Sequence, residues 1–203
     1  MQSSGSMVSE CSICRLYEIA VEVSKPKRGV KPGFDPEHVI GYILLAARGP
    51  IGRPLAAKAL GIGDTAAKTM IRRLREIGVI ETRGREGSSL KQELRQIVEN
   101  IHFCQNGNCI GINICGIDVC EASRGLSKVL ELRDSLVSRG VTPLLILCCS
   151  SGFVAPGAPH DVVDGLISSC LECEGRDICV VLGGDIGLVE VSRVILAIAK
   201  VVC

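Results

Sequence analysis

Aromatic residues are scarce in this sequence of 203 residues: they make up 2% of it, and tryptophan is absent. Proteins that bind single-stranded nucleic acid stack the bases on aromatic side chains, so the shortage argues against that mode of binding. The core must be filled by leucine, isoleucine, valine and alanine instead. A hydrophobic content of 47% is ample for this purpose.

Long apolar runs are also missing. No stretch approaches the roughly 18 residues needed to span a bilayer, and the N-terminus lacks a basic segment followed by an apolar core. We therefore expect a cytoplasmic protein with no membrane partner. Asparagine and glutamine together number only eight. A low content of these heat-labile amides is typical of thermophiles, in whose cytosol disulfides can persist.

The motifs of common enzymes are absent as well. The three histidines, at positions 38, 102 and 160, are isolated, and no Ser/His/Asp or paired-carboxylate motif occurs. Val180–Arg193 has the order strand, glycine turn and helix, which can hold a phosphate on helix-terminal amides. Its spacing matches neither of the two common glycine-rich nucleotide motifs. We predict no enzyme, and keep a nucleotide-binding enzyme as the third hypothesis.

Charge is divided unevenly along the chain. Residues 1–103 carry 16 Lys/Arg against 11 Asp/Glu, whereas residues 104–203 carry 7 against 11, so the net charge of +1 hides a basic half and an acidic half. This asymmetry indicates that only the first half meets a polyanion.

The first half has the pattern of a helical domain that ends in a hairpin. Residues 1–34 are expected to be a flexible extension and linker, with room for a short helix over Cys11–Val23. Residues 35–90 follow as a domain. Capping residues and apolar spacing predict its elements, which are helices from Pro36 to Gly49, Arg53 to Leu60 and Thr65 to Ile77, and a hairpin over 79–90 with its turn at 84–87.

The third of these helices is amphipathic and basic. Its apolar stripe is Ala67, Met70, Ile71, Leu74 and Ile77. Together with the hairpin it predicts a winged helix-turn-helix, in which this helix enters the major groove of DNA and the hairpin reaches phosphates or the minor groove. The predicted DNA-binding residues are Thr65, Lys68, Thr69, Arg72, Arg73, Arg83 and Arg85. The alternative is that the same fold serves protein contacts, with these arginines solvated or paired with Glu76, Glu81 and Glu86.

The second half changes its periodicity. Residues 91–104 predict a connecting helix of the kind that often dimerises such proteins. Residues 105–203 predict the order β-α-β-β-α-β-α, a small α/β sandwich domain with a mixed sheet, including a helix from Pro159 to Cys173. The expected fold class is therefore α+β, with a winged helix-turn-helix followed by this sandwich.

A resemblance to a known family rests on residues of both halves, roughly 37–203. The segment GLSKVLELRDSLVSRGVTPLLILCCSSGFVAPG, followed by GRDICVVLGGD and an apolar helix, resembles the C-terminal domain of a family of archaeal winged-helix proteins. The function of that domain is unknown. The resemblance implies a transcriptional regulator whose C-terminal fold is similar to the small α/β domains called GAD-like. It supplies no catalytic residues, and the cysteine-rich stretch Cys104–Cys120 departs from the family pattern.

Twelve cysteines leave several chemistries open. A structural zinc ion needs four ligands, and one hypothesis is a site formed by Cys104, Cys109, Cys115 and Cys120. Disulfides such as Cys104 with Cys109 are the alternative, and a redox or metal sensor is the functional version of either. No other cofactor is expected. Cysteines in apolar strands are interpreted as small hydrophobic residues, namely Cys148, Cys149 and Cys179.

A candidate effector pocket comprises Arg133, Asp134, Gly183, Gly184 and Asp185, although an ion pair between helix and loop explains the charged members equally well. The leading hypothesis is a DNA-binding transcriptional regulator that binds double-stranded DNA as a homodimer and has a C-terminal domain for effector sensing or oligomerisation. The second hypothesis is a protein-interaction module with a structural zinc or disulfide site.

Overall fold

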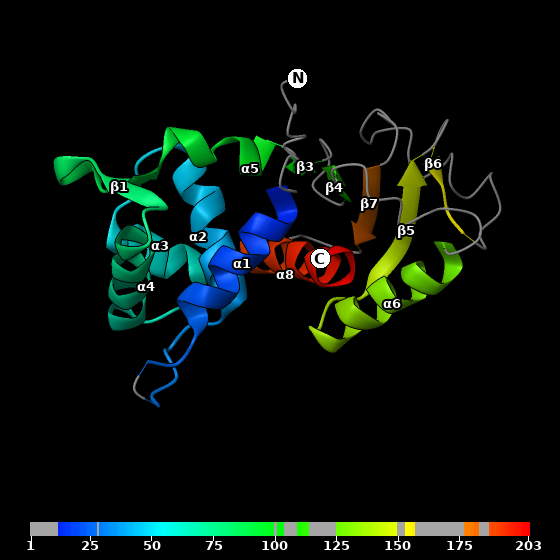
Figure 1. The fold of residues 1–203 in the computed structure, drawn as a ribbon, viewed down its shortest axis with the longest axis horizontal. Coiled ribbons are helices and arrows are strands. Elements are labelled where there is room, and N and C mark those ends of the chain that lie inside the picture. The colour runs from blue at the N-terminus through cyan, green and yellow to red at the C-terminus, as the bar shows by residue number, and fades with distance from the viewer. Residues whose placement is uncertain are drawn as a thin grey trace, which may run out of the picture.

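Two helices from opposite ends of the chain pack together in the middle of the molecule (Figure 1). They are α1 (Ser12–Ser24) and α8 (Leu188–Val202). This computed structural model describes residues 12–27, 29–99, 101–103, 109–113, 125–149, 153–156, 177–182 and 187–203. The apolar face of α1 belongs to the core, with Leu16 and Ala20 fully buried. The short helix for which the sequence left room over Cys11–Val23 is therefore present, and it belongs to the core rather than to a flexible extension.

The three predicted helices and the hairpin are present in the first half. Their bounds are α2 (Pro36–Arg48), α3 (Arg53–Leu60), α4 (Asp64–Glu76), β1 (Ile80–Thr82), the 3-10 turn η1 (Gly84–Glu86) and β2 (Ser88–Leu90). Helix α2 begins where expected, because Pro36 fits its first position and the amide of Asp35 donates to Nδ1 of His38 at 2.9 Å. Gly61 ends α3 in the left-handed conformation, with φ of 65°.

The hairpin is held against the loop that precedes α3. Ile51 exchanges two backbone hydrogen bonds with Ser88 of β2, at 2.9 and 3.1 Å. Gly87 permits this approach: its φ is +114°, and a side-chain carbon on it would collide with the backbone of Ile51. The hairpin is therefore a packed part of the fold and keeps a defined position beside α4.

The connecting helix expected over residues 91–104 is replaced by three short elements. They are the 3-10 turn η2 (Gln92–Leu94), helix α5 (Gln96–Glu99) and strand β3 (Ile101–Phe103). Ile101 and Phe103 pair with Ile112 and Ile110 of strand β4 (Cys109–Asn113). The helical spacing of the apolar residues was overridden by this pairing, because strand formation depends on a partner strand that local sequence does not reveal.

The second half is built on a five-stranded sheet in the order β3-β4-β7-β5-β6. The remaining strands of this sheet are β5 (Pro143–Cys149), β6 (Phe153–Val154) and β7 (Asp177–Leu182). The second half also contains helix α6 (Gly125–Ser138). Every pairing among these described strands is antiparallel, so the expected mixed sheet is wrong. The helix expected from Pro159 to Cys173 lies outside the described residues. The fold class is α+β, as predicted.

Helix α8 packs on both halves of the molecule. It contacts α1, α2 and α3 and also α6 and β4. Its residues are apolar nearly all round, and Val194, Ile195, Leu196 and Ala197 in succession are fully buried. Gly41 of α2 allows the close approach, since a side-chain carbon there would lie 3.2 Å from the Ser192 hydroxyl. Among the helices in the described segments, none has the length and apolarity required to cross a membrane.

The cysteines depart from the sequence analysis at two places. Cys14 of α1 is disulfide-bonded to Cys203, the residue that follows α8. Cys148 and Cys179, which we interpreted as small hydrophobic residues, are disulfide-bonded too. That interpretation is therefore wrong for these two strand residues, although both are buried as expected.

The Cys14–Cys203 bond closes nearly the whole chain, so its loss should destabilise the protein. We expect Cys14→Ser to lower the free energy of unfolding by about 2–5 kcal/mol, because the open chain gains entropy when unfolded. Guanidinium unfolding under oxidising conditions measures this. Cys203→Ser and the double variant serve as controls and should give the same value. Equal stability of the variant and the wild type would contradict the prediction.

Tyr42 of α2 should make stability fall at alkaline pH. Burial raises the pKa of Tyr42 to about 12, and the nearby Ser88 hydroxyl and Arg75 guanidinium offset only part of that effect. The unfolded chain ionises near pH 10, so stability is complete below pH 10 and is lost between about pH 10 and 12. We expect Tyr42→Phe to reduce this loss by on the order of 2 kcal/mol. Urea unfolding of both proteins at pH 9, 10 and 11 tests it; identical pH profiles would contradict it.

Candidate nucleic-acid interface

Helix α4 presents one polar stripe to solvent. Thr65, Lys68, Arg72 and Arg75 are exposed and follow one another at intervals of three or four residues, which places them on neighbouring positions of the helix. The opposite face is buried as predicted, except at the end of the helix, and consists of Ala67, Met70, Ile71 and Leu74. Thr69 lies beside the stripe, and its hydroxyl donates to the carbonyl of Thr65 at 3.0 Å.

Arg75 is a member of this stripe that the sequence analysis left out. It lies ten residues after Thr65 and seven after Lys68, so helical spacing alone could have placed it there. Its neighbour Arg73 was assigned to the exposed face and is not on it. Only 6% of Arg73 is exposed, which corrects the prediction that it faces outward.

Arg73 instead joins α4 to the end of α1. Its Nη1 donates to the carbonyl oxygens of Val23 at 2.7 Å and Lys25 at 2.8 Å, and its guanidinium lies 5.7 Å from the ring centre of Phe34. Helix α1 has no basic residue in its own last turn. Arg73 therefore supplies the positive charge that favours a helix C-terminus and satisfies two carbonyl groups there.

The tip of the hairpin adds further basic groups. Arg83 and Arg85 are exposed as predicted, and Arg83 forms an ion pair with Glu81 at 3.1 Å. Arg85 forms none within the described part of the chain. Gly84 turns the chain with φ of 56°, which brings these two arginines to the outer end of the hairpin.

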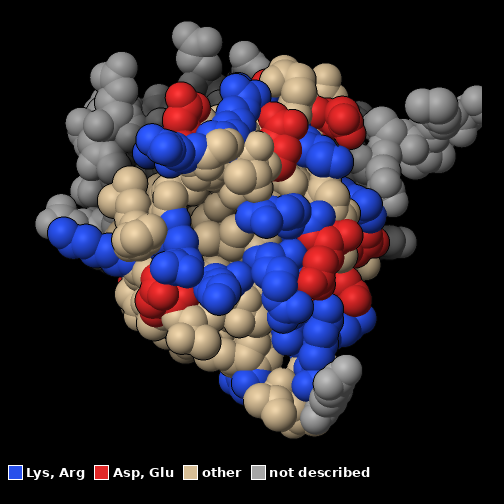
Figure 2. Space-filling view, turned by 90° about the vertical axis from the view of Figure 1, so that its left-hand side faces the viewer, with Lys and Arg blue, Asp and Glu red and all other residues tan. Residues whose placement is uncertain are grey.

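Carboxylates accompany part of this basic surface. Arg72 pairs with Glu76 at 3.1 Å and Arg53 with Asp64 at 2.8 Å, and the side chains of all four residues are at least 44% exposed. Exposed pairs of this kind contribute little to stability and can exchange partners. Other exposed basic residues form no ion pair among the described residues, namely Lys58, Lys68, Arg75 and Arg85. Figure 2 shows basic side chains gathered across the middle of this end of the molecule.

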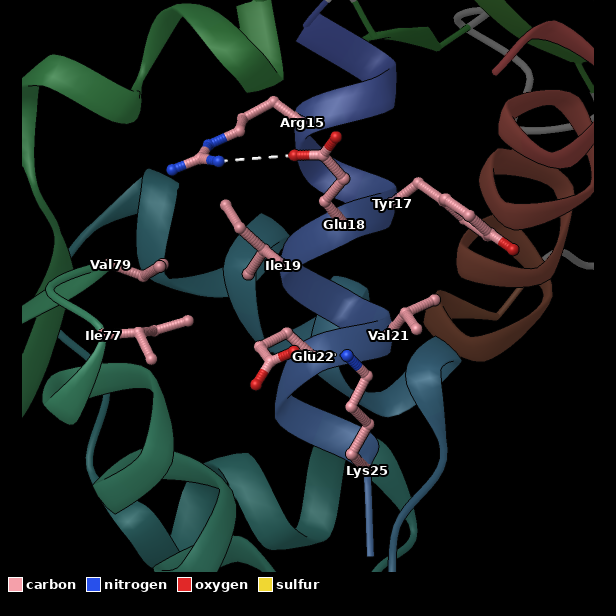
Figure 3. Close-up of a pocket in the computed structure, with 9 residues that line it drawn as sticks. All are labelled: Arg15, Tyr17, Glu18, Ile19, Val21, Glu22, Lys25, Ile77 and Val79. Atoms are coloured by element: carbon pink, nitrogen blue, oxygen red, sulfur yellow. Dashed lines mark hydrogen bonds and ion pairs between the residues drawn. The ribbon is translucent and has the colours of Figure 1, made fainter.

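A groove of about 470 Å³ lies next to this surface, between α1 and the connection from α4 to β1 (Figure 3). Ile19 of α1 faces Ile77 and Val79 across it. Ile77 was predicted to be buried but is 47% exposed, because α4 ends at Glu76 and the chain leaves the helix. The charged groups of the groove neutralise each other in the pairs Arg15–Glu18 and Lys25–Glu22, and the latter lowers the pKa of Glu22. The groove therefore has an apolar wall and a rim without excess charge.

Of the predicted effector pocket, the structure describes Arg133 and Asp134. Arg133 and Asp134 are exposed and pair with each other at 3.0 Å. Arg133 lines a hollow of about 180 Å³ beside β5, whereas Asp134 lines another of about 640 Å³ between α6 and α8. Within the described residues, Arg133 and Asp134 form no ion pair with a loop and line no common cavity. Gly183, Gly184 and Asp185 lie outside the described residues.

The predicted zinc ligands cannot be placed as a group. Cys109 belongs to β4, where its backbone pairs with Val181. Cys104, Cys115 and Cys120 lie outside the described residues. In the part of the chain that the structure describes, no three His, Cys, Asp or Glu residues are close enough to hold a metal ion.

Comparison with known proteins identifies a structural relative without a named function. No protein-family model and no curated protein matches the sequence. A solved structure, the hypothetical protein PH0730 from Pyrococcus horikoshii OT3, is similar with a TM-score of 0.59 at 18% identity. The likeness covers 82% of this chain and 91% of that one. At this level of identity it shows a shared fold and nothing about activity.

Replacing Arg73 should weaken the fold. We expect Arg73→Ala to lower the free energy of unfolding by about 2–4 kcal/mol, because the buried carbonyl of Val23 and the partly buried carbonyl of Lys25 lose a charged donor at the end of α1. Arg72→Ala, at the preceding position and just over a quarter of a turn around the helix, is exposed. It is the matched control and should change stability by less than about 0.5 kcal/mol. Urea unfolding measures both. Equal effects of the two substitutions would show that Arg73 has no special structural role.

Proposed function

We propose that this protein is a DNA-binding transcriptional regulator of the archaeal winged-helix type. In this proposal α3 and α4 form the helix-turn-helix, α4 is the recognition helix and the β1–β2 hairpin is the wing. The observation that carries the proposal is the exposed stripe of Thr65, Lys68, Arg72 and Arg75 on α4, with the wing arginines beside it. The bases would be read by this stripe in the major groove.

The electrostatics of the surface support a polyanionic partner. Among the described residues, several exposed basic groups on α3, α4 and the hairpin form no ion pair with a carboxylate, and the other exposed ones take part only in exposed ion pairs. A phosphate can replace a surface carboxylate at low cost, because such pairs are weak in water. Each basic side chain that binds a phosphate displaces a counterion from the duplex, and the release of that counterion favours binding.

The role of the second half is a further part of this proposal. We propose that it mediates assembly of a homodimer or senses a small effector. A two-fold dimer would present two copies of α4 to half-sites about one helical turn apart. Because α8 packs against the second half and also against α3, which packs against α4, a change in that half would reach the recognition helix through packed side chains.

Substitution of Arg72 tests the proposed recognition helix. We expect Arg72→Ala to weaken binding to duplex DNA by roughly tenfold, because a base or phosphate contact is lost. Fluorescence anisotropy with random-sequence duplexes, titrated at several salt concentrations, measures affinity and its salt slope. Selection of the tightest binders from the same pool reveals any preferred sequence.

Arg133→Ala is the matched control for this substitution. Its side chain is 55% exposed and pairs with a carboxylate at 3.0 Å, against 61% and 3.1 Å for Arg72. Arg133 lies in the other half of the molecule, so the Arg133→Ala variant should bind duplex DNA as the wild type does. Absent or salt-insensitive binding by the wild type would refute the proposed function. Equal loss in both variants would refute the assignment of α4.

A further inference from the structure

The segment between α1 and α2 runs along one side of α4, next to its exposed stripe. Near the beginning of α4, a side-chain carbon on Gly33 would lie 3.4 Å from that of Ala66. Further along, Arg73 holds the carbonyl of Lys25, and near the end Nζ of Lys27 lies 3.3 Å from Oε2 of Glu76. The segment is thus fixed to α4 at three successive positions.

This segment contains a tight turn that projects from the molecule. The amide of Val30 donates to the carbonyl of Lys27 at 3.2 Å, and the two residues form an antiparallel bridge. Gly29 has φ of +77°, a conformation suited to glycine in such turns. Val30 is 71% exposed, so the turn stands clear of the core.

We propose that the turn closed by the bridge between Lys27 and Val30 is a second phosphate-contacting element for duplex DNA, with Lys27 as the contacting group. In Figure 1 this part of the chain lies on one side of α4 and the β1–β2 hairpin on the other. A helix placed in the major groove has a phosphate backbone on each side of it. The hairpin and the turn flank α4 as the two backbones flank the groove. This inference rests on the proposed function and adds a contact that the fold alone does not imply.

Glu76 links the turn to the recognition helix. Its two carboxylate oxygens accept from Arg72 at 3.1 Å and from Lys27 at 3.3 Å, so the three side chains form one exposed cluster. The carboxylate holds Lys27 close to the stripe in the free protein. On the duplex it competes with phosphate for both cations, and as an exposed group it competes weakly.

Arg73 is the residue that positions this element. Its guanidinium is buried and holds the carbonyl oxygens of Val23 and Lys25, four and two residues before Lys27. The side chain does not approach the surface where DNA would lie. Its part in binding is to keep the turn beside α4.

The experiment compares Lys27→Ala with Lys200→Ala, a control that removes an exposed lysine from α8. The probe is a fluorescein-labelled random-sequence duplex of about 30 base pairs, roughly three helical turns. We expect Lys27→Ala to weaken binding roughly threefold to tenfold and to reduce the salt slope by about 0.9, the value for one phosphate. Lys200→Ala should behave as the wild type. Glu76→Gln should bind more tightly, because the competing charge is gone.

The outcomes separate this inference from the proposed function. If Arg72→Ala weakens binding while Lys27→Ala leaves affinity and salt slope unchanged, the turn makes no phosphate contact and the inference fails alone. If the wild type binds no duplex, both fail. Thermal melting checks that each variant is folded. Lys27→Gln, which keeps the length of the side chain, repeats the measurement if Lys27→Ala alters the melt.

Discussion

Helix α8 is apolar on nearly every side, and this constraint sets the architecture. A helix of that kind must be covered all round, and the fold achieves this by placing it between the helical first half and the sheet of the second. The Cys14–Cys203 disulfide ties its end to α1, so both ends of the described chain meet at the same place. The two halves share one core. The need to bury α8 on all sides sets the position of helices α2, α3 and α4 relative to the sheet.

A single buried guanidinium connects this core to the candidate interface. Arg73 replaces the cation that α1 lacks at its C-terminus, and in doing so it orders the residues that lead into the turn closed by Lys27 and Val30. On the other side of α4, the bridge between Ile51 and Ser88 fixes the hairpin. The recognition surface in our proposal is therefore held by contacts that lie behind it, which leaves its exposed side chains free to meet a partner.

Much of the first half was predictable because its signals are local. Pro36, Gly61 and the apolar spacing of α4 act within a few residues, and the predicted helices and hairpin agree with the structure to within one or two positions at most ends. The exposed positions of Lys68 and Arg72 followed from the same periodicity, and those of Arg83 and Arg85 followed from the predicted hairpin turn. Strand β3 was missed because Ile97, Val98 and Ile101 also fit a helix, and only the partner strand β4 decides between the two.

The sequence by itself determined which segments are amphipathic, where most helices begin and end, and which half carries excess positive charge. Only the tertiary structure decided that Arg73 is buried while Arg72 is exposed, that the sheet is antiparallel in its described strands, and that Cys14 meets Cys203. The physical reason is the separation along the chain over which each kind of interaction acts. Capping and periodicity act between near neighbours in the chain, whereas burial, strand pairing and disulfide formation depend on residues that folding brings together from far apart.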